Sequence, residues 1–477
     1  MKQTAVPSRR PIVLVLFPLP FDEQALARLE PAWPQFEFVR IGFDLFRFPQ
    51  NLRLLSFDID RFVEQLLKRF RSREIAAVIS THDQFGALAA ALLANRLGLP
   101  GTPVQALLRA QNKAAARMVH REVLPQHTPE FCTFRYDADP QTAITLPYPV
   151  FVKPVKAAFS VLARRCHSPN ELAQLLELNP WERFIIRALT RPFRQLSQRL
   201  LPEVPDADHF IAETALEPGW QVCVDGYAEH GCITMLEVVD SLMYPGTQAF
   251  RRFELPSRLP APVRERAIAL ATQAAAALGL THGLFNVELI WHPDTDRLWI
   301  VEVNPRMAGQ FNDLYERVHG RSLWDIQLAL ALGSAVPAAP GGRYGAAASF
   351  VYREFGDAIK QSPSPENLAW LAQHAPDANL YLDLKFGASR RRERKWVGSY
   401  RYALLHLGGA NHQDLMSRYE AIDERLDFDY ARSSYRERVL ARVVRGVSNP
   451  TASFAQTALT VTLARARRQR GANPRSF

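Results

Sequence analysis

The stretch that decides the fold is FNVELIWHPDTDRLWIVEVNPRMAGQ, residues 285–310. Two largely apolar runs flank the turn-forming segment HPDTD (292–296), so the stretch predicts a β-hairpin. Each run carries one carboxylate, Glu288 in the first and Glu302 in the second. A carboxylate in a strand that otherwise favours burial needs a compensating partner. The residues that follow Glu302 indicate what that partner is.

Asn304 stands two residues after Glu302, so on a strand the two side chains share one face. If Glu288 pairs with Glu302 across the hairpin, two carboxylates and one amide oxygen converge. Hard oxygen ligands of this kind suit Mg²⁺ or Mn²⁺ and not zinc. The alternative is an ion pair between Glu302 and Arg306, with Asn304-Pro305 beginning a turn. Because one hairpin carries all three ligands, the sequence favours a metal site.

Two lysines upstream of this hairpin are candidate phosphate ligands. Lys153 lies in VFVKP (150–154), whose apolar residues predict a strand, and Lys113 lies in QNKAAAR (111–117), within a helix predicted over 107–123. Taken alone, Lys153 could be an edge-strand charge and Lys113 a solvated surface residue. A magnesium site commonly completes its ligand shell with substrate phosphates, which in turn need cations. Their order ahead of the acidic hairpin therefore favours both lysines as ligands.

Length and composition bound the class of protein. A chain of 477 residues is too long for one compact core, so two or three lobes are expected. The four cysteines have no CxxC spacing, which favours buried thiols in a reducing compartment. The arginine pair before PIVLVLF (11–17) is similar to an export signal, but Pro18 and Pro20 interrupt the apolar run. With no apolar run of about 18 residues, we expect no membrane span and a cytoplasmic protein.

The net charge of +10 is unevenly distributed. From Ser433 to Phe477 the chain has nine arginines and one acid, Glu437, and SRRRERKW (389–396) forms a second basic cluster. Such runs are usually solvated surface or a mobile tail, with contact to an acidic partner as the second reading. No recognisable nucleic-acid-binding motif accompanies them, so we expect no nucleic-acid partner.

Apolar strands and amphipathic helices alternate along the first hundred residues. The predicted strands are 11–17, 36–42 and 75–81, and the predicted helices are 21–29, 59–70 and 84–99. This alternation implies a parallel sheet covered by helices. No G-x-G-x-x-G follows the first strand, so the dinucleotide-binding fingerprint is absent. The lobe is expected to serve as scaffold or as a substrate wall.

The remainder of the chain has mixed strand and helix patterns. Residues 209–216 and 221–239 predict antiparallel strands, with D-G (225–226) and H-G (230–231) as turn signals. A long helix is predicted over 264–280, and further strand and helix patterns continue to about residue 430. The predicted fold class is therefore α/β and α+β, in several domains.

Several of these segments together resemble the ATP-grasp superfamily, in particular the branch of L-amino-acid ligases and biotin-carboxylase-like proteins. GLPGTPVQALLRAQNKAAAR (98–117) resembles the entry to the ATP-binding lobe, and VFVKP resembles the strand with the second nucleotide lysine. FIAETAL (210–216) followed by VCVDG (222–226) resembles the hinge that holds adenine and ribose. The hairpin resembles the metal-binding element, and YRYALLHLGG (400–409) resembles the closing C-terminal subdomain. The likeness covers residues 10 to 430.

The resemblance implies a domain order. An N-terminal parallel α/β lobe (1–106) is followed by an ATP-grasp domain (107–345), in which two α+β subdomains grip ATP. The small lobe covers residues 120–210 and the large lobe residues 211–345. A small C-terminal α/β subdomain (346–430) and the basic tail (431–477) complete the chain.

The resemblance also implies residue roles. The nucleotide contacts would come from Lys113 and Lys153, with Lys156 and Ser160 also in reach of phosphate and Glu213 at the hinge near adenine or ribose. One or two Mg²⁺ (or Mn²⁺) ions would be held by Glu288, Glu302 and Asn304. Arg306 would clamp the acyl phosphate or the substrate carboxylate, because a planar guanidinium suits bidentate recognition. Arg306 and Lys153 are the catalytic candidates.

Three features depart from the family pattern. The flap segment PVKAAFS (154–160) has no glycine, and Gln221 stands where many members have glutamate. The segment TRPFRQLSQRLLPEVPDAD (190–208) is longer than the approach to the hinge requires, and the sequence assigns it no role.

The function implied is an ATP-dependent carboxylate–amine ligase that forms an acyl phosphate and releases ADP and phosphate. Its partners would be a small-molecule carboxylate and an amine. Biotin-carboxylase-like carboxylation is one alternative. A nucleotide-binding scaffold without turnover is another, favoured by the flap and opposed by the complete acid, amide and arginine set. A nucleic-acid binder driven by the basic tail would lose affinity steeply with salt. The substrates and the oligomeric state, including a homodimer, stay open.

Overall fold

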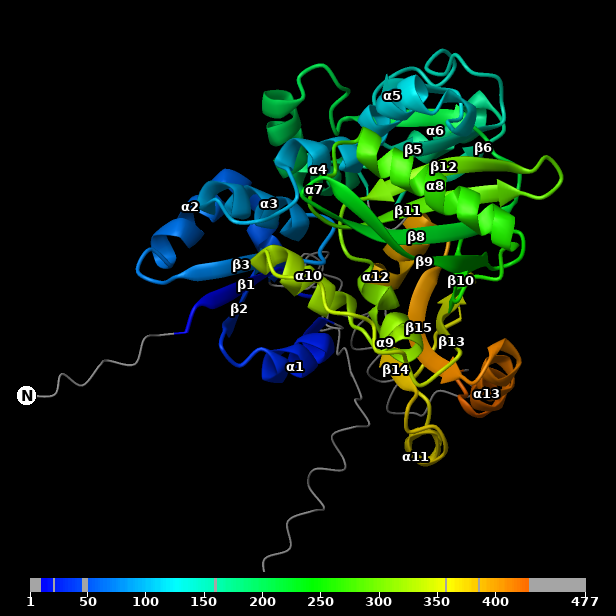
Figure 1. The fold of residues 1–477 in the computed structure, drawn as a ribbon. Coiled ribbons are helices and arrows are strands. Elements are labelled where there is room, and N and C mark those ends of the chain that lie inside the picture. Colours follow the sequence, from blue (N-terminus) through cyan, green and yellow to red (C-terminus); the bar gives the residue numbers. More distant parts are fainter. Residues whose placement is uncertain are drawn as a thin grey trace, which may run out of the picture.

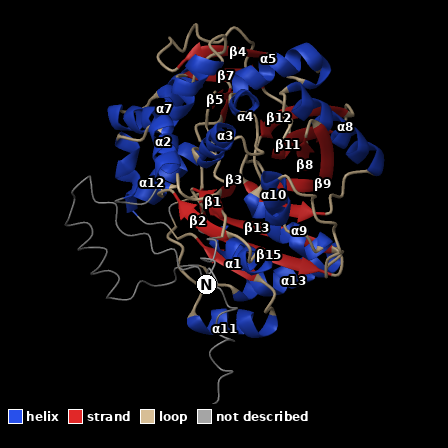
Figure 2. Ribbon diagram, turned by 60° about the vertical axis from the view of Figure 1, so that its left-hand side comes forward, coloured by secondary structure: helices blue, strands red, loops and turns tan. Residues whose placement is uncertain are grey.

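The computed structural model describes residues 10–428, apart from 20–21, 45–49, 158–160, 357 and 385–386. Ser160 and the basic tail therefore lie outside the described residues. In the described part of the chain, the strands form three sheets of three, eight and four strands. Figure 1 shows the three-stranded sheet, in blue, apart from the other two. Helices pack on these sheets (Figure 2). The predicted α/β and α+β fold class is confirmed.

The N-terminal lobe is a parallel sheet of order β2-β1-β3, formed by β1 (Ile12–Leu16), β2 (Glu37–Ile41) and β3 (Ile75–Ile79). Its helices are α1 (Asp22–Ala32), α2 (Ile59–Arg69) and α3 (Gly86–Leu97), with the short 3-10 helix η1 (Gln50–Leu55) before α2. Every residue of β1 is fully buried, as expected for a continuous apolar strand inside a parallel sheet. The predicted alternation of strands and helices is confirmed.

The single helix predicted over 107–123 is wrong, because the chain forms two helices there. They are α4 (Val104–Gln111) and α5 (Lys113–Val123), and Asn112 between them is extended, with φ −94° and ψ 105°. The Asn112 side chain accepts a hydrogen bond from the N–H of Ala115 at 2.9 Å. This N-cap is a local alternative to the helix, which asparagine favours. Lys113 consequently lies at the first turn of a helix.

The small lobe has an antiparallel sheet of order β4-β7-β5-β6. Its strands are β4 (Phe131–Arg135), β5 (Val150–Pro154), β6 (Arg164–Cys166) and β7 (His209–Thr214), and its helical segments are η2 (Pro125–His127), α6 (Pro169–Leu176) and α7 (Pro180–Leu200). In the central pair, Phe151 is opposite Glu213 and Lys153 is opposite Ile211. Lys153 and Glu213 are therefore diagonal neighbours on one face of the sheet.

The eight-stranded sheet has the order β12-β11-β8-β9-β10-β13-β15-β14. The first five strands in this order are β12 (Arg297–Asn304), β11 (Gly283–His292), β8 (Trp220–Glu229), β9 (Cys232–Met243) and β10 (Phe250–Leu255). Helix α8 (Ala261–Ala277) packs on β9, β11 and β12. The H-G turn is confirmed, since His230 and Gly231 connect β8 to β9 with positive φ. The D-G turn is wrong: Asp225 and Gly226 lie inside β8, where the register with β9 shifts by a bulge.

The chain after residue 345 extends the same sheet. Its strands are β13 (Ala346–Glu354), β14 (Asn379–Leu382) and β15 (Tyr400–Gly409), and β13 pairs with β10. The helical segments of the C-terminal half are η3 (Gly309–Phe311), α9 (Asn312–His319), α10 (Leu323–Leu332), α11 (Pro365–His374), α12 (Gly387–Val397) and α13 (His412–Arg425). Helix α10 packs on both β3 and β11, so it joins the N-terminal lobe to the large lobe.

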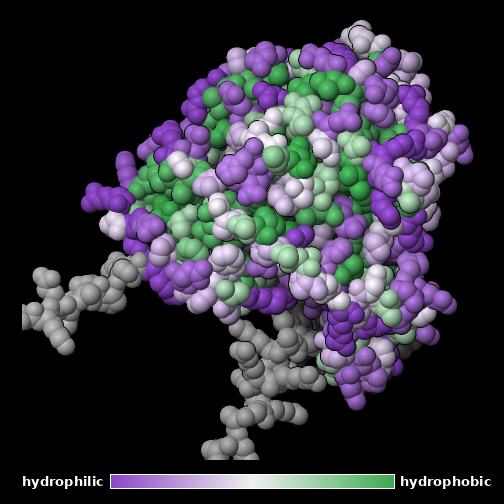
Figure 3. All heavy atoms as spheres, viewed as in Figure 1, coloured by the Kyte–Doolittle hydropathy of each residue, from purple (hydrophilic) through white to green (hydrophobic). Residues whose placement is uncertain are grey.

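No helix within the described ranges is long and apolar enough to cross a bilayer. Figure 3 shows hydrophilic residues around the rim of one face and hydrophobic residues gathered toward its middle.

Candidate active site

The acidic hairpin has the register on which the metal prediction depends. Glu288 on β11 lies directly opposite Glu302 on β12, and Asn286 lies opposite Asn304. The Asn304 side chain donates to Glu288 Oε1 at 3.1 Å. Gln221, on the neighbouring strand β8, donates to the other oxygen of Glu288 at 3.2 Å. The hairpin therefore brings two carboxylates and an amide together, and the glutamine that replaces an expected acid lies beside them.

The carboxylates of this pair interact with each other. Burial, together with the nearby charge of Glu302, raises the pKa of Glu288 to about 7. Two neighbouring acids resist ionising together unless a cation compensates them. The oxygen donors fit Mg²⁺ or Mn²⁺. No group of three or more His, Cys, Asp and Glu side chains with a metal-binding arrangement occurs among the described residues.

Glu302 forms an ion pair with Lys113 and not with Arg306. Lys113 Nζ lies 2.8 Å from Glu302 Oε1 and also donates to the carbonyl of Ala157 at 3.1 Å. The backbone N–H of Lys113 donates to Val155 O at 3.0 Å, which fixes the start of α5 against the end of β5. The alternative in which Glu302 pairs with Arg306 is therefore not what the structure shows, because the partner of this acid is Lys113, the predicted phosphate ligand.

Lys153 belongs to a buried ionic triad. Its Nζ lies 3.0 Å from Glu213 Oε2, and Arg117 Nε lies 2.8 Å from Glu213 Oε1. Arg117 also donates to the carbonyl of Val301 at 2.9 Å. Burial lowers the pKa of Lys153, and the Glu213 carboxylate opposes that effect. Glu213 is thus the internal counter-ion of two cations, and through Arg117 it connects the small-lobe sheet to β12.

Two charged groups of the site were missed by the sequence analysis. Arg117 carried a signal, because it stands four residues after Lys113 and such residues share a helix face. Asp83 carried a weaker one: it follows β3, and ligands of open parallel sheets gather at the carboxyl ends of the strands.

Asp83 brings the N-terminal lobe into the site. Its Oδ1 lies 4.0 Å from Lys156 Nζ and 3.9 Å from Arg306 Nε, and Gln111 donates to the same oxygen at 3.2 Å. Burial raises the pKa of Asp83, but the charges of Lys156, Arg306 and Lys113 outweigh it and the pKa is lowered. An ionised carboxylate therefore lies among the cations that the sequence assigned to phosphate and substrate.

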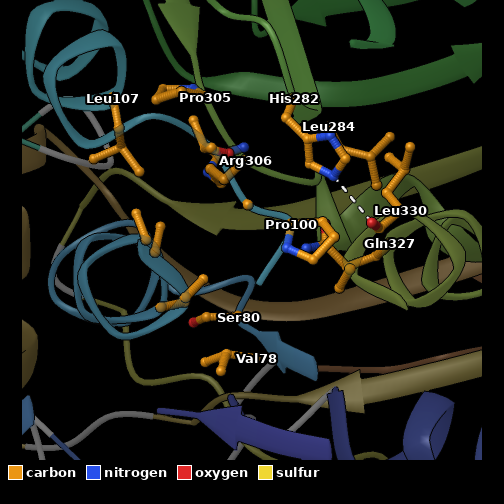
Figure 4. A pocket seen from close by; sticks show the side chains of 18 residues that line it. Val78, Ser80, Pro100, Leu107, His282, Leu284, Pro305, Arg306, Gln327 and Leu330 are labelled. Atoms are coloured by element: carbon orange, nitrogen blue, oxygen red, sulfur yellow. Dashed lines mark hydrogen bonds between the residues drawn. The ribbon is translucent and has the colours of Figure 1, made fainter. Parts of the chain in front are cut away.

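A cavity adjoins Arg306 between the N-terminal and large lobes. It has a volume of about 40 Å³, and its wall includes Ser80, Thr102, His282, Arg306 and Gln327. Four alanines on one side of α3 also line it: Ala87, Ala90, Ala91 and Ala94. Figure 4 shows Arg306 at the edge of this space, with His282 bonded to the carbonyl of Leu330. The small alanine side chains leave this space open, and its volume is sufficient for only a few ligand atoms.

The structure gathers most of the predicted residues. Charge interactions connect Glu288, Glu302, Arg306 and Lys113. The charges of Glu302, Arg306 and Lys113 also act on Lys156. The charges of Glu302 and Lys113 also act on Lys153, and Glu213 is the counter-ion of Lys153. Ser160 falls outside the described residues.

Sequence comparison identifies part of this chain. Residues 146–313 match the family model described as an ATP-grasp domain. The protein y4rH of Sinorhizobium fredii is 26% identical over 301 residues, which is 63% of this chain and 53% of that protein. A D-alanine–D-alanine ligase of Synechococcus is 28% identical over 163 residues, 33% of this chain and 40% of the ligase. The chain thus spans about half, or less, of the length of these relatives.

Structural comparison extends the likeness over most of the chain. An L-amino acid ligase from Bacillus licheniformis superposes with a TM-score of 0.65 at 17% identity, covering 89% of this chain and 100% of that one. A carboxyaminoimidazole ribonucleotide synthase from Aspergillus clavatus superposes with a TM-score of 0.61 at 16% identity, covering 87% and 98%. At these identities the comparison shows a shared fold. Residues 146–313 thus match an ATP-grasp domain, and most of the chain shares the fold of these enzymes.

Proposed function

We propose that the protein is an ATP-dependent carboxylate–amine ligase that releases ADP and phosphate. The observation that carries the proposal is the convergence of the acid pair Glu288 and Glu302 with three cations, Lys113, Lys156 and Arg306. The acids are suited to metal and the cations to phosphate and carboxylate. Both sets lie in one site of an ATP-grasp fold.

The chemistry needs no nucleophilic side chain. A carboxylate is a poor electrophile because its leaving group would be oxide. Attack of the substrate carboxylate on the γ-phosphorus of ATP forms an acyl phosphate and releases ADP. Attack of the amine on the acyl carbon then forms the amide and releases inorganic phosphate, with loss of one proton from nitrogen. Phosphoryl transfer depends mainly on alignment and on neutralising negative charge.

The charged residues have separate roles in this scheme. Lys113, Lys153 and Lys156 bind and orient the ATP phosphates, and the buried carboxylate of Glu213 keeps Lys153 in place. Glu288, Glu302 and Asn304 would hold Mg²⁺ or Mn²⁺, which when bound supplies charge neutralisation at the phosphates. Arg306 clamps the substrate carboxylate and then the acyl phosphate, because its planar fork matches both groups.

The acid substrate is proposed to lie with its carboxylate at Arg306 and its remaining atoms in the adjoining cavity. A cavity of about 40 Å³ favours a small acid. The four cysteines are free thiols, which supports the cytoplasm, a reducing compartment, as the proposed location.

The proposal is tested by ADP and phosphate release with Mg²⁺ across pools of amino acids and other carboxylates. Each pool is measured with and without bicarbonate. Glu302→Gln should reduce release at least about 100-fold, since loss of supporting groups alone costs a metal site about 10–100-fold. Glu217→Gln is the matched control, because Glu217 is an exposed acid that pairs with Arg165 on the small lobe.

Three results separate the candidate functions. Release that requires both an acid and an amine, and that is lost in Glu302→Gln, supports the ligase. Release that requires bicarbonate and no second carboxylate assigns the carboxylase alternative. Binding of ATP without release in any pool contradicts both enzymes and assigns a nucleotide-binding scaffold.

A further inference from the structure

The segment to which the sequence assigned no role, residues 190–208, forms the second half of α7 and the connection to β7. Helix α7 begins with a capping box: Asn179 accepts from the N–H of Glu182, and Glu182 accepts from the N–H of Asn179. Although the helix lies within the small lobe in sequence, Phe193, Leu196 and Leu201 pack in the hydrophobic core of the N-terminal lobe. In this way α7 connects the two lobes.

Polar contacts reinforce this packing. Arg199 pairs with Asp60 of α2 at 3.1 Å, and the Arg191 guanidinium donates to the carbonyl of Phe57. Figure 2 shows α7 beside α2, to the left of the small-lobe strands β5 and β7. The helix is therefore held at positions along its second half.

Phe193 reaches the phosphate site from this helix. The centroid of its ring lies 4.2 Å from the ammonium nitrogen of Lys156, and Phe193 is 3% exposed. The Lys156 side chain is also buried, and its polar contacts to Asp83 are longer than ideal, at 3.4 Å to the carbonyl and 4.0 Å to the carboxylate. A cation over an aromatic face is attracted most strongly when water is excluded.

The same segment also contacts the residue that precedes Lys113. The Asn112 side chain donates to the carbonyl of Pro205 at 2.7 Å, while its oxygen caps α5 through the N–H of Ala115. Lys113 is the first residue of that helix. One connection, residues 180–208, thus supports two of the candidate phosphate lysines.

We propose that this connection is a positioning element of the nucleotide site, in which the Phe193 ring holds the Lys156 ammonium and Pro205 fixes the cap before Lys113. The inference rests on the proposed function, because it requires that both lysines bind phosphate. The proposal gives a role to the long segment 190–208, because helix α7, anchored in the N-terminal lobe, holds the Lys156 side chain in position before ATP binds. A preplaced ammonium loses less conformational freedom on binding.

The test measures binding and not turnover. The dissociation constant of a non-hydrolysable ATP analogue with Mg²⁺ is determined by calorimetry. Phe193→Leu keeps an apolar side chain and removes the aromatic face, so it should weaken binding about tenfold. Replacing Phe193 by mono-, di- and trifluorinated phenylalanine preserves its shape and should weaken binding in steps, because each fluorine reduces the negative charge on the ring face.

Leu196→Ala is the matched control. Leu196 is on the same helix, in the same core and fully buried, and it has no contact with Lys156 among the described interactions. This variant should lower the melting temperature and leave the dissociation constant within about twofold, because the substitution leaves the contact between the Phe193 ring and Lys156 in place. Asn112→Ser keeps an N-cap oxygen but loses the amide nitrogen that reaches the carbonyl of Pro205, so it should weaken binding a few fold while retaining the helix.

The pH profile of binding gives a readout that a purely structural role would not change. Burial lowers the pKa of Lys156 to about 8, with Asp83 and Glu302 opposing and Lys113 and Arg306 reinforcing that effect. Binding should therefore weaken as the pH rises through about 8. Removing the ring destabilises the charged ammonium, so in Phe193→Leu the weakening should begin at lower pH.

The outcomes are distinct. Graded weakening in the fluorinated series, with normal binding by Leu196→Ala, supports the inference. Unchanged binding by Phe193→Leu, or equal weakening by Leu196→Ala, overturns it. If the parent protein binds the analogue but releases no ADP with any acid, the proposed ligase activity fails while these binding results still decide the inference.

Discussion

Replacing Glu213 by glutamine should destabilise the folded protein by about 3–5 kcal/mol, because it removes the common counter-ion of two buried cations. Glu213 accepts from Arg117 at 2.8 Å and lies 3.0 Å from Lys153. The three side chains are between 3% and 6% exposed. Glutamine keeps the volume but carries one oxygen and an amide group that would face a cation.

The structure sets both the size and the limit of this effect. The triad carries a net charge of +1 with Glu213 ionised and +2 after the substitution. Burial already lowers the pKa of Lys153, so this lysine can relieve part of the cost by losing its proton. The destabilisation of Glu213→Gln should therefore be smaller at high pH, where deprotonating Lys153 costs less.

Thermal unfolding followed by circular dichroism measures the effect, with Glu217→Gln as the exposed control on the same lobe. The double variant Glu213→Gln/Arg117→Met restores a net charge of +1 and should recover a substantial part of the loss. A melting temperature within about 1 °C of the parent for Glu213→Gln would refute the buried triad. Weaker ATP binding with unchanged stability would instead favour the expected contact of Glu213 with adenine or ribose.

Other residues make further expectations testable. Arg306→Lys should lower kcat/KM for the acid about 100-fold and leave KM for ATP unchanged, because lysine lacks the bidentate fork; equal losses for both substrates would contradict this. Ala91→Leu, which fills the cavity, should raise KM for larger acids more than for small ones in the same assay. Burial raises the pKa of Asp22 from 3.8 to about 7, so its contribution to stability is lost as the pH rises across that interval. In Asp22→Asn the melting temperature should therefore depend less on pH than in the parent protein. If the curves of melting temperature against pH are parallel for the two proteins, Asp22 is not the cause of the pH dependence.

The hairpin shows which features of the site a local sequence pattern can predict. Alternation along a strand places residues on faces, so Glu302 and Asn304 were predicted on one side of β12. The pairs next to the turn would place Glu288 opposite Val301, and it is the register shift between Glu288 and Leu289, a β-bulge, that brings Glu288 opposite Glu302. The parallel sheet of the N-terminal lobe followed from the same kind of signal, the alternation of apolar strands with helices.

Local signals also misled where a side chain competed with the backbone. Asn112 looked like an interior residue of a long helix, but its side chain caps a new one. Asp225 and Gly226 looked like a turn, but they form a bulge inside β8, where a side chain on Gly226 would come within 2.9 Å of Met235 and Phe285. In both cases the residue type permits two local structures, and packing chose between them.

The sequence by itself determined the strand and helix pattern, the acidic hairpin and the lysines suited to phosphate, because periodicity and residue chemistry are local properties. Only the tertiary structure decided which charges meet. Lys113 and Glu302 are 189 residues apart, and Asp83 reaches Lys156 from another lobe. Phe193 meets that lysine only because α7 packs into the N-terminal core. Such pairings depend on how separate lobes pack against one another, and no spacing within one segment encodes that arrangement.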